Sequence, residues 1–193
     1  MAAAALVVIG LLASGCGNQA AGSAATFGES RISDEQLNAE VQEVLAAKQQ
    51  PLDTADEVLV AETLGRMLTI ELVDAVAERE GVVVTQGQID EQLAAYDGEA
   101  GGRAEVEKIF IEQSIAPGQI EEIVRLNLQA QALGIALMPN GSAEEQGQAV
   151  FEAVGAMSDE LNTTASPRFG TWDAGTLSIG PSADDLSTPP SLG

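Results

Sequence analysis

The chain has 193 residues, 45% of them hydrophobic and 3% aromatic, and its 30 acidic and 8 basic residues give a net charge of −22. This charge and the lack of any basic run exclude nucleic acid as an expected partner, because phosphate binding needs clustered Lys and Arg. The sequence contains no histidine, so Ser/His/Asp and Cys/His catalytic arrangements are excluded, and it has neither a calcium-loop nor a phosphate-loop motif. We therefore expect a protein that is not an enzyme and needs no metal ion or cofactor.

An apolar run near the N-terminus predicts export from the cytoplasm. The run extends from Ala2 to Leu12, which is shorter than the roughly 20 residues of a membrane-spanning helix. It is typical of the apolar region of a signal peptide, although no Lys or Arg precedes Arg31. The stretch Leu12-Ala13-Ser14-Gly15-Cys16 follows and resembles the lipobox of bacterial lipoproteins. This resemblance implies that residues 1–15 are a signal peptide.

Cys16 is the only cysteine, so it cannot form a disulfide within the chain. By the lipobox resemblance, Cys16 is the lipidated first residue of the mature protein; the alternative is a buried structural cysteine. Acyl chains such as palmitate would hold the protein on the extracytoplasmic face of the cell membrane without a spanning segment. The small and polar residues 16–24 would then form a tether between the membrane and the fold.

Four patterns predict helix starts, because a Ser or Thr followed three residues later by Glu or Gln can form a capping box. They are Ser33-Asp34-Glu35-Gln36, Thr54-Ala55-Asp56-Glu57, Thr85-Gln86-Gly87-Gln88 and Ser142-Ala143-Glu144-Glu145. With the apolar periodicity and the Gly and Pro breakers, they predict six helices. These run from Ser33 to Pro51, from about Ala55 to about Glu80 with Gly81 as the stop, from Thr85 to Asp97-Gly98, from Arg103 to Ser114, from Pro117 to Pro139, and from about Ala143 to Leu161. The second helix is the longest and would be the spine of a mainly helical domain.

Three stretches carry a resemblance to a known family. They are Ile32-Ser33-Asp34-Glu35-Gln36-Leu37, Glu80-Gly81-Val82-Val83-Val84-Thr85-Gln86-Gly87-Gln88-Ile89-Asp90 and Ile123-Val124-Arg125-Leu126-Asn127-Leu128-Gln129. Together they resemble the N-terminal helical domain of SurA-like and PrsA-like extracytoplasmic chaperones, over about residues 25–138, and more distantly the chaperone region of trigger factor. Ser166-Pro167-Arg168-Phe169-Gly170-Thr171-Trp172-Asp173 is similar to a segment that closes such lipoproteins in high-GC Gram-positive bacteria.

The resemblance implies a holdase that binds unfolded or secreted polypeptides in the cell envelope. It does not imply peptidyl-prolyl isomerase activity, because the parvulin domain of complete family members uses histidines and this chain has none. The rival interpretation is a structural or adaptor lipoprotein that docks one dedicated envelope or secreted partner, since a fold does not fix a function. The sequence also leaves open whether the domain forms a homodimer.

The two ends of the domain are expected to meet. By the resemblance, Thr26-Phe27-Gly28 corresponds to a short strand before the first helix, and we expect it to pair with the segment near Phe169 to Trp172. That segment should be extended, because a residue before proline avoids the helical region. The domain would then span residues 25–173, and residues 174–193, rich in Ser, Pro and Asp, would be disordered.

Five residues are candidates for contact with a bound polypeptide: Met67, Ile70, Phe110, Met138 and Trp172. Flexible methionines suit promiscuous binding surfaces, and the longest helix has more apolar surface than a single core would cover. Alternatively, Met67, Met138 and Met157 are ordinary core residues. For Trp172, packing against the helical core is favoured over client contact.

Overall fold

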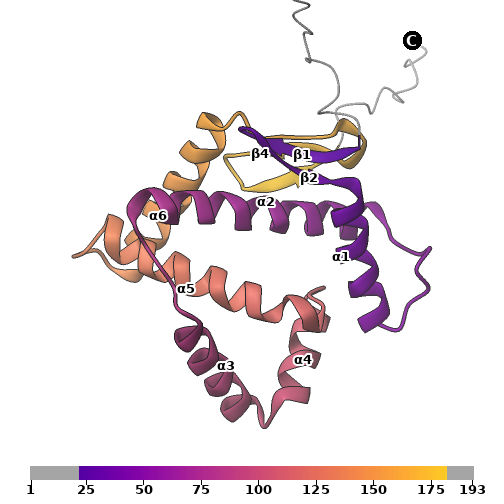
Figure 1. Ribbon diagram of the computed structural model, residues 1–193, viewed down its shortest axis with the longest axis horizontal. Helices are drawn as coiled ribbons and strands as arrows, with labels where there is room; N and C mark the ends of the chain where they lie inside the picture. Colours follow the sequence, from indigo (N-terminus) through magenta and orange to yellow (C-terminus); the bar gives the residue numbers. More distant parts are fainter. Residues whose placement is uncertain (1–21, 182–193) are drawn as a thin grey trace, which may run out of the picture.

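The structure described here, a computed structural model of which residues 22–181 are described, is mainly helical with small antiparallel sheets (Figure 1). Its helices are α1 (Asp34–Ala47), α2 (Glu57–Glu80), α3 (Gln86–Ala100), α4 (Arg103–Glu112), α5 (Ile120–Leu137) and α6 (Ala143–Glu160), with short 3-10 helices η1 (Pro117–Gln119) and η2 (Pro167–Phe169). Its strands are β1 (Ser23–Phe27), β2 (Ser30–Ser33), β3 (Thr164–Ala165), β4 (Thr171–Asp173) and β5 (Ser178–Gly180). The mainly helical fold with six helices is confirmed for this part of the chain, whereas the signal peptide and Cys16 lie outside it.

Most predicted helix starts are confirmed. At Ser33, Thr85 and Ser142, the side-chain hydroxyl accepts a hydrogen bond from the backbone N–H of the residue three positions later. The side chain of that later residue accepts a hydrogen bond from the backbone N–H of the cap residue, which completes the capping box. The predicted capping box at Thr54 is wrong, because the N-cap of α2 is Asp56, whose carboxylate accepts the Leu59 N–H at 2.8 Å. Asp is the stronger cap, and the Thr54 hydroxyl instead donates to the carbonyl of Pro51 at 2.6 Å.

Glycines with positive φ end α2 and α3. Gly81 ends α2 with φ of 68°, as predicted. Helix α3, by contrast, continues through Asp97-Gly98 and stops at Gly101, where φ is 90°, because an isolated glycine is tolerated inside a helix. Pro117 opens η1 instead of α5, which begins at Ile120. The other helix ends lie within one turn of the predicted positions.

The core consists of three apolar clusters arranged around α2, which crosses the middle of the molecule with strands above it and α5 below it in Figure 1. The first cluster joins Leu64 and Leu68 to β1, β2 and α1. The second joins Leu72 and Val76 to α5 and α6, and the third joins Ile70 to α3 and α5. Several faces of α2 are therefore covered, and this helix is the spine that its length predicts.

The N-terminal strand does pair with the C-terminal part of the chain, but not where we expected. Strand β1 lies between β2 and β3, with Thr26 opposite Thr164, so the expected pairing near Phe169 to Trp172 is wrong. Pro167 sets the backbone angle for the turn η2 and so interrupts the expected extended segment. The fold also starts earlier than residue 25, because Ser23 begins β1 and Ala24 is fully buried. The predicted tether therefore includes two residues that belong to the sheet.

Strands β4 and β5 form a hairpin that corrects the prediction of disorder from residue 174. Trp172 lies opposite Ile179 in this hairpin. Its turn is built by Asp173, whose carboxylate accepts the Gly175 N–H at 2.8 Å and the Thr176 hydroxyl at 2.9 Å. An Asp that bonds to the backbone two residues on is a known turn former. Most of the Ser, Pro and Asp residues that suggested disorder come after this hairpin, and the fold continues to Gly180. Residues 182–193 lie outside the described part.

Candidate binding groove

A groove of about 840 Å³ lies between the first half of α2 and the segment that carries η2 and β5. One wall is α2, which contributes Val58, Val60 and Ala61. The opposite wall contains Phe169, Leu177 and Ile179. The volume is in the range of ligand-binding pockets, roughly 300–1,000 Å³. We call this feature the α2 groove; it combines apolar walls with charged residues at its rim.

The two walls lie close together at Gly65, and Gly170 fixes the end of the hairpin. A Cβ at Gly65 of α2 would make an ordinary contact with Ile179 of β5, at 3.7 Å, so the hairpin lies against the helix backbone. At Gly170, φ is 119° and ψ is −165°, a conformation that is essentially limited to glycine. A Cβ at Gly170 would also overlap the carbonyl oxygen of Gly180 and lie 2.6 Å from Ile179 Cγ2. Glycine at position 170 is therefore required for the close approach of its backbone to the end of β5.

The basic side chains of the groove already have partners within the chain. Arg168 forms an ion pair with Asp34 of α1, and its guanidinium lies 4.5 Å from the centre of the Phe169 ring. Arg66 donates to Gln119 Oε1 at 3.4 Å. The acidic residues Glu57 and Glu62 also line the groove and are exposed. No ion pair joins either of them to another residue between 22 and 181, so the groove presents unpaired negative charge.

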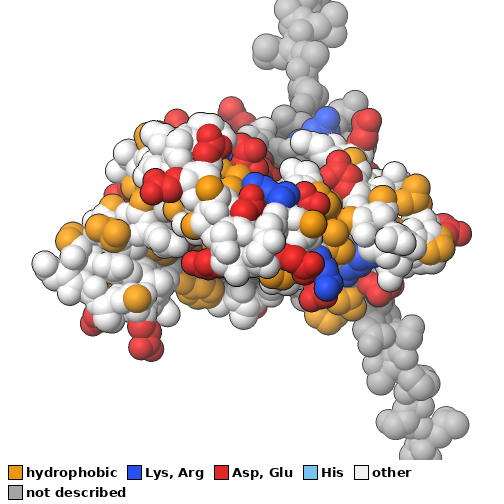
Figure 2. Space-filling model, turned by 90° about the horizontal axis from the view of Figure 1, so that it is seen from below, with side chains coloured by type: hydrophobic (Ala, Val, Ile, Leu, Met, Phe, Trp, Pro, Cys, Tyr) orange, Lys and Arg blue, Asp and Glu red, His pale blue; other side chains and the backbone are white. Residues whose placement is uncertain are grey.

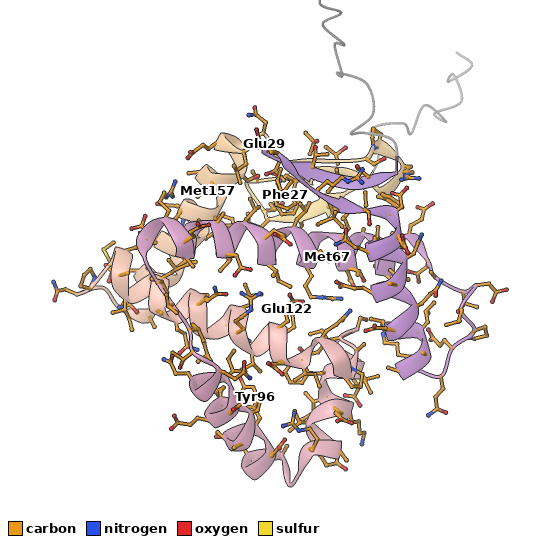
Figure 3. All side chains as sticks on the ribbon, viewed as in Figure 1. Phe27, Glu29, Met67, Tyr96, Glu122 and Met157 are labelled. Carbon is orange, nitrogen blue, oxygen red and sulfur yellow. The ribbon has the colours of Figure 1, made fainter. Side chains whose placement is uncertain are left out.

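A partly buried polar cluster lies behind the groove, where α1, α2 and η1 meet. Gln119 connects the three elements, since its Nε2 donates to Glu40 Oε2 at 3.1 Å and its Oε1 accepts from Arg66 and from the Ala116 N–H. Burial raises the pKa of Glu40 to about 7, although the charge of Arg66 acts in the opposite direction. Burial likewise lowers the pKa of Arg66. Glu122, which lies between α5 and α2 (Figure 3), adds to the rise at Glu40.

The sequence offered one signal for this cluster that we did not use. Glu40 follows Leu37 by three residues and precedes Val44 by four, so it shares the apolar face of α1. A charged residue on the apolar face of a helix either is buried with that face or exposes part of it to solvent. Glu40 was not among the residues predicted from the sequence to have a role.

The five residues predicted to contact a client do not form one site. Met67, on α2 below the strands (Figure 3), is 9% exposed in the first cluster, and Ile70 is 6% exposed in the third. Phe110 of α4 packs against the third cluster near Tyr96, with ring centres 6.4 Å apart. Met138 is exposed at the far end of α5. None of the five lines the α2 groove, and Met67 and Ile70 are core residues.

Trp172 has the packing role that the sequence favoured. It is half-buried and contacts both the first and the second cluster, so it connects the strands to α6. Its indole Nε1 donates to Ser158 Oγ at 2.8 Å. Trp172 also lines a second, more open cleft of about 830 Å³ along α6, together with Phe151 and Asp159. Met157 is also buried in the second cluster.

We expect Trp172→Phe to lower the free energy of unfolding by about 1 kcal/mol, because the hydrogen bond to Ser158 is lost while most of the apolar contact stays. Denaturant unfolding, monitored by circular dichroism, measures this change in the free energy of unfolding. In the Trp172→Phe background, Ser158→Ala should have little further effect. Two fully additive losses would show that the indole and the hydroxyl do not interact.

Comparison with known protein families, curated proteins and solved structures returns no significant match. Between residues 22 and 181, no helix combines the length and the apolarity needed to cross a membrane. Over the same residues, no group of acidic or cysteine side chains is arranged to hold a metal ion. The function therefore has to be inferred from the chain's own motifs and from the α2 groove.

Proposed function

We propose that the protein is a lipid-anchored chaperone of the bacterial cell envelope, which holds unfolded or extended polypeptides without isomerase activity. Cys16 would anchor it to the extracytoplasmic face of the membrane, as the lipobox resemblance implies. The helical domain would bind its clients in the α2 groove. The observation that carries the proposal is the groove itself, an elongated apolar surface with a free acidic rim.

The length of the groove suits an extended chain. Residues of α2 from Glu57 to Thr69 line it, which at about 1.5 Å per residue corresponds to roughly 18 Å. An extended polypeptide rises about 3.3 Å per residue, so roughly five or six of its residues would lie along this wall. The apolar walls would bind side chains of many kinds, because the hydrophobic effect depends on the apolar area that is buried and not on a particular hydrogen-bond pattern.

The charge of the protein supports the same role. A net charge of −22 favours solubility and keeps protein molecules apart. In Figure 2, the face viewed from the side of α3 and α4 carries acidic side chains in many places and basic ones in few. A client held by such a protein would share its repulsion from other molecules, which counteracts aggregation. The SurA-like motifs of the sequence point in the same direction.

Light scattering of refolding clients tests the proposal. The form that starts after Cys16 should suppress the aggregation of several unrelated clients at stoichiometric ratios. Suppression of none of them, by a preparation that circular dichroism shows to be helical, would overturn the chaperone proposal. In that case the adaptor interpretation would lead, and a single partner would be sought by pull-down from the envelope.

A further inference from the structure

The α2 groove combines two features that together define a class of ligand. Its walls are apolar, and the charge at its rim is negative overall. Strand β5, which contributes Ser178, Ile179 and Gly180 to the groove, pairs with β4 and lies against α2, where a Cβ at Gly65 would be 3.7 Å from the Ile179 backbone nitrogen. Because α2 lies this close to β5, the class of ligand is defined by side chains and not by backbone pairing with β5.

The negative charge is distributed around α2. Glu57 and Glu62 are five positions apart on α2, which places them about 7.5 Å apart along the axis and roughly 140° apart around the helix. Both nevertheless line the groove. Basic side chains at different positions of a ligand would therefore face the two carboxylates separately.

The cations of the groove satisfy these carboxylates only in part. Arg168 is paired with Asp34. Arg66 donates to Gln119, and it is shared among the charges of Glu40, Glu62 and Glu122, so negative charge exceeds positive charge at that end of the groove. Glu57 lies in the first turn of α2 and forms no ion pair with another residue between 22 and 181. A ligand with basic side chains would complete the electrostatics of the groove, whereas an acidic ligand would be repelled.

We infer that the α2 groove selects extended segments that combine apolar residues with Lys or Arg. The basic side chains of the segment face Glu57 and Glu62 on α2, and its apolar side chains pack on Phe169 and Ile179. This inference rests on the proposed function and names the class of segment that the chaperone would hold.

Fluorescence anisotropy with labelled ten-residue peptides tests the inference on the mature chain carrying Cys16→Ser. One peptide alternates Val and Lys, a second alternates Val and Glu, and a third alternates Val and Ser. We expect the Val/Lys peptide to bind about tenfold more tightly than the Val/Ser peptide at low salt, as two ion pairs imply, and the Val/Glu peptide more weakly still. The difference should shrink as salt is added.

A matched pair of double variants separates the groove from the general charge of the protein. Glu57→Gln with Glu62→Gln should reduce the preference for Lys over Ser to less than about threefold. Glu91→Gln with Glu99→Gln removes the same charge from exposed positions of α3 and should leave the preference unchanged. Equal losses in both double variants would show that the preference comes from net charge, and the inference would be wrong.

Two more outcomes separate this inference from the proposed function. If all three peptides bind equally and Val58→Glu weakens them all, the groove binds polypeptides but does not select basic ones, and only the inference fails. If no peptide binds to a folded preparation, the proposed function fails as well. Val83→Glu is the control for Val58→Glu, because Val83 is 78% exposed outside the groove and Val58 is 64% exposed within it.

Discussion

Replacing Gly170 by alanine is expected to lower the free energy of unfolding by about 3 kcal/mol or more. The backbone at Gly170 has φ of 119°, and an L-residue in that region is strained by about 1–3 kcal/mol. The new Cβ would also overlap the Gly180 carbonyl oxygen, and overpacking of this kind costs about 1–3 kcal/mol more. Because Gly170 and Gly180 both line the α2 groove, peptide binding should weaken together with stability. Denaturant unfolding and anisotropy measure the two effects.

Gly147→Ala is the matched control for this variant. Gly147 lies inside α6, and nothing lies within 4 Å of a Cβ built there. Alanine should therefore stabilise the protein by about 0.5–1 kcal/mol, the difference in helix propensity between the two residues. A Gly170→Ala protein as stable as the wild type would show that the backbone of Gly170 does not approach the end of β5 as closely as described.

Stability should fall as the pH rises toward and beyond neutrality, and Glu40→Gln should remove much of this dependence. The pKa of Glu40 is raised from 4.5 to about 7 in the folded protein, so between these values the folded state binds a proton that the unfolded state does not. The contribution of Glu40 is therefore fully present below about pH 4.5 and is lost as the pH rises through about 7. A full shift would correspond to about 3 kcal/mol, and solvent screening of this half-buried group reduces it to about 1–2 kcal/mol.

Charged groups on every neighbouring element affect this titration. Arg66 of α2 favours the ionised form, whereas Glu43 of α1 and Glu122 of α5 disfavour it. Burial also raises the pKa of Glu71 on α2, so some pH dependence of the same sign should remain in the Glu40→Gln variant.

Denaturant unfolding between about pH 5 and about pH 8 measures the effect of Glu40. Glu35→Gln serves as a control, because Glu35 is an exposed residue of the same helix and does not contribute to the raised pKa of Glu40. At about pH 8, Glu40→Gln should be more stable than the wild type. Identical pH profiles for the wild type and Glu40→Gln would show that Glu40 is as well solvated in the folded protein as in the unfolded one.

The fold was predictable where local chemistry determines it. Ser33, Thr85 and Ser142 begin helices as capping boxes, and Gly81 ends one, because each of these signals acts within a single turn of the chain. The spine role of α2 followed from its length and its apolar residues. The register of β1 was not predictable, since its pairing with Thr164 and Ala165 joins residues far apart in the sequence.

The candidate site was largely beyond sequence reasoning. The α2 groove brings Val58 next to Phe169 and Ile179 through tertiary packing alone. The hairpin of its second wall has strands of three residues each, which are too short to give a periodic signal. Met67 and Ile70 were chosen because apolar residues surround α2, but three clusters cover that helix instead of one. Met67→Glu would therefore bury an unpaired carboxylate and unfold the protein, so this variant cannot test client contact. Val58, which is exposed, is the better position for testing client contact.

Site-specific photo-crosslinking tests the central claim most directly. A photoreactive phenylalanine analogue replaces Val58 within the α2 groove or Val83 outside it, and an unfolded client is added before irradiation. Binding in the groove predicts strong crosslinks from position 58 and few from position 83, with the crosslinked client peptide identified by mass spectrometry. Equal crosslinking from both positions, or none from position 58 by a protein that still suppresses aggregation, would place the client elsewhere and contradict the assignment of the groove.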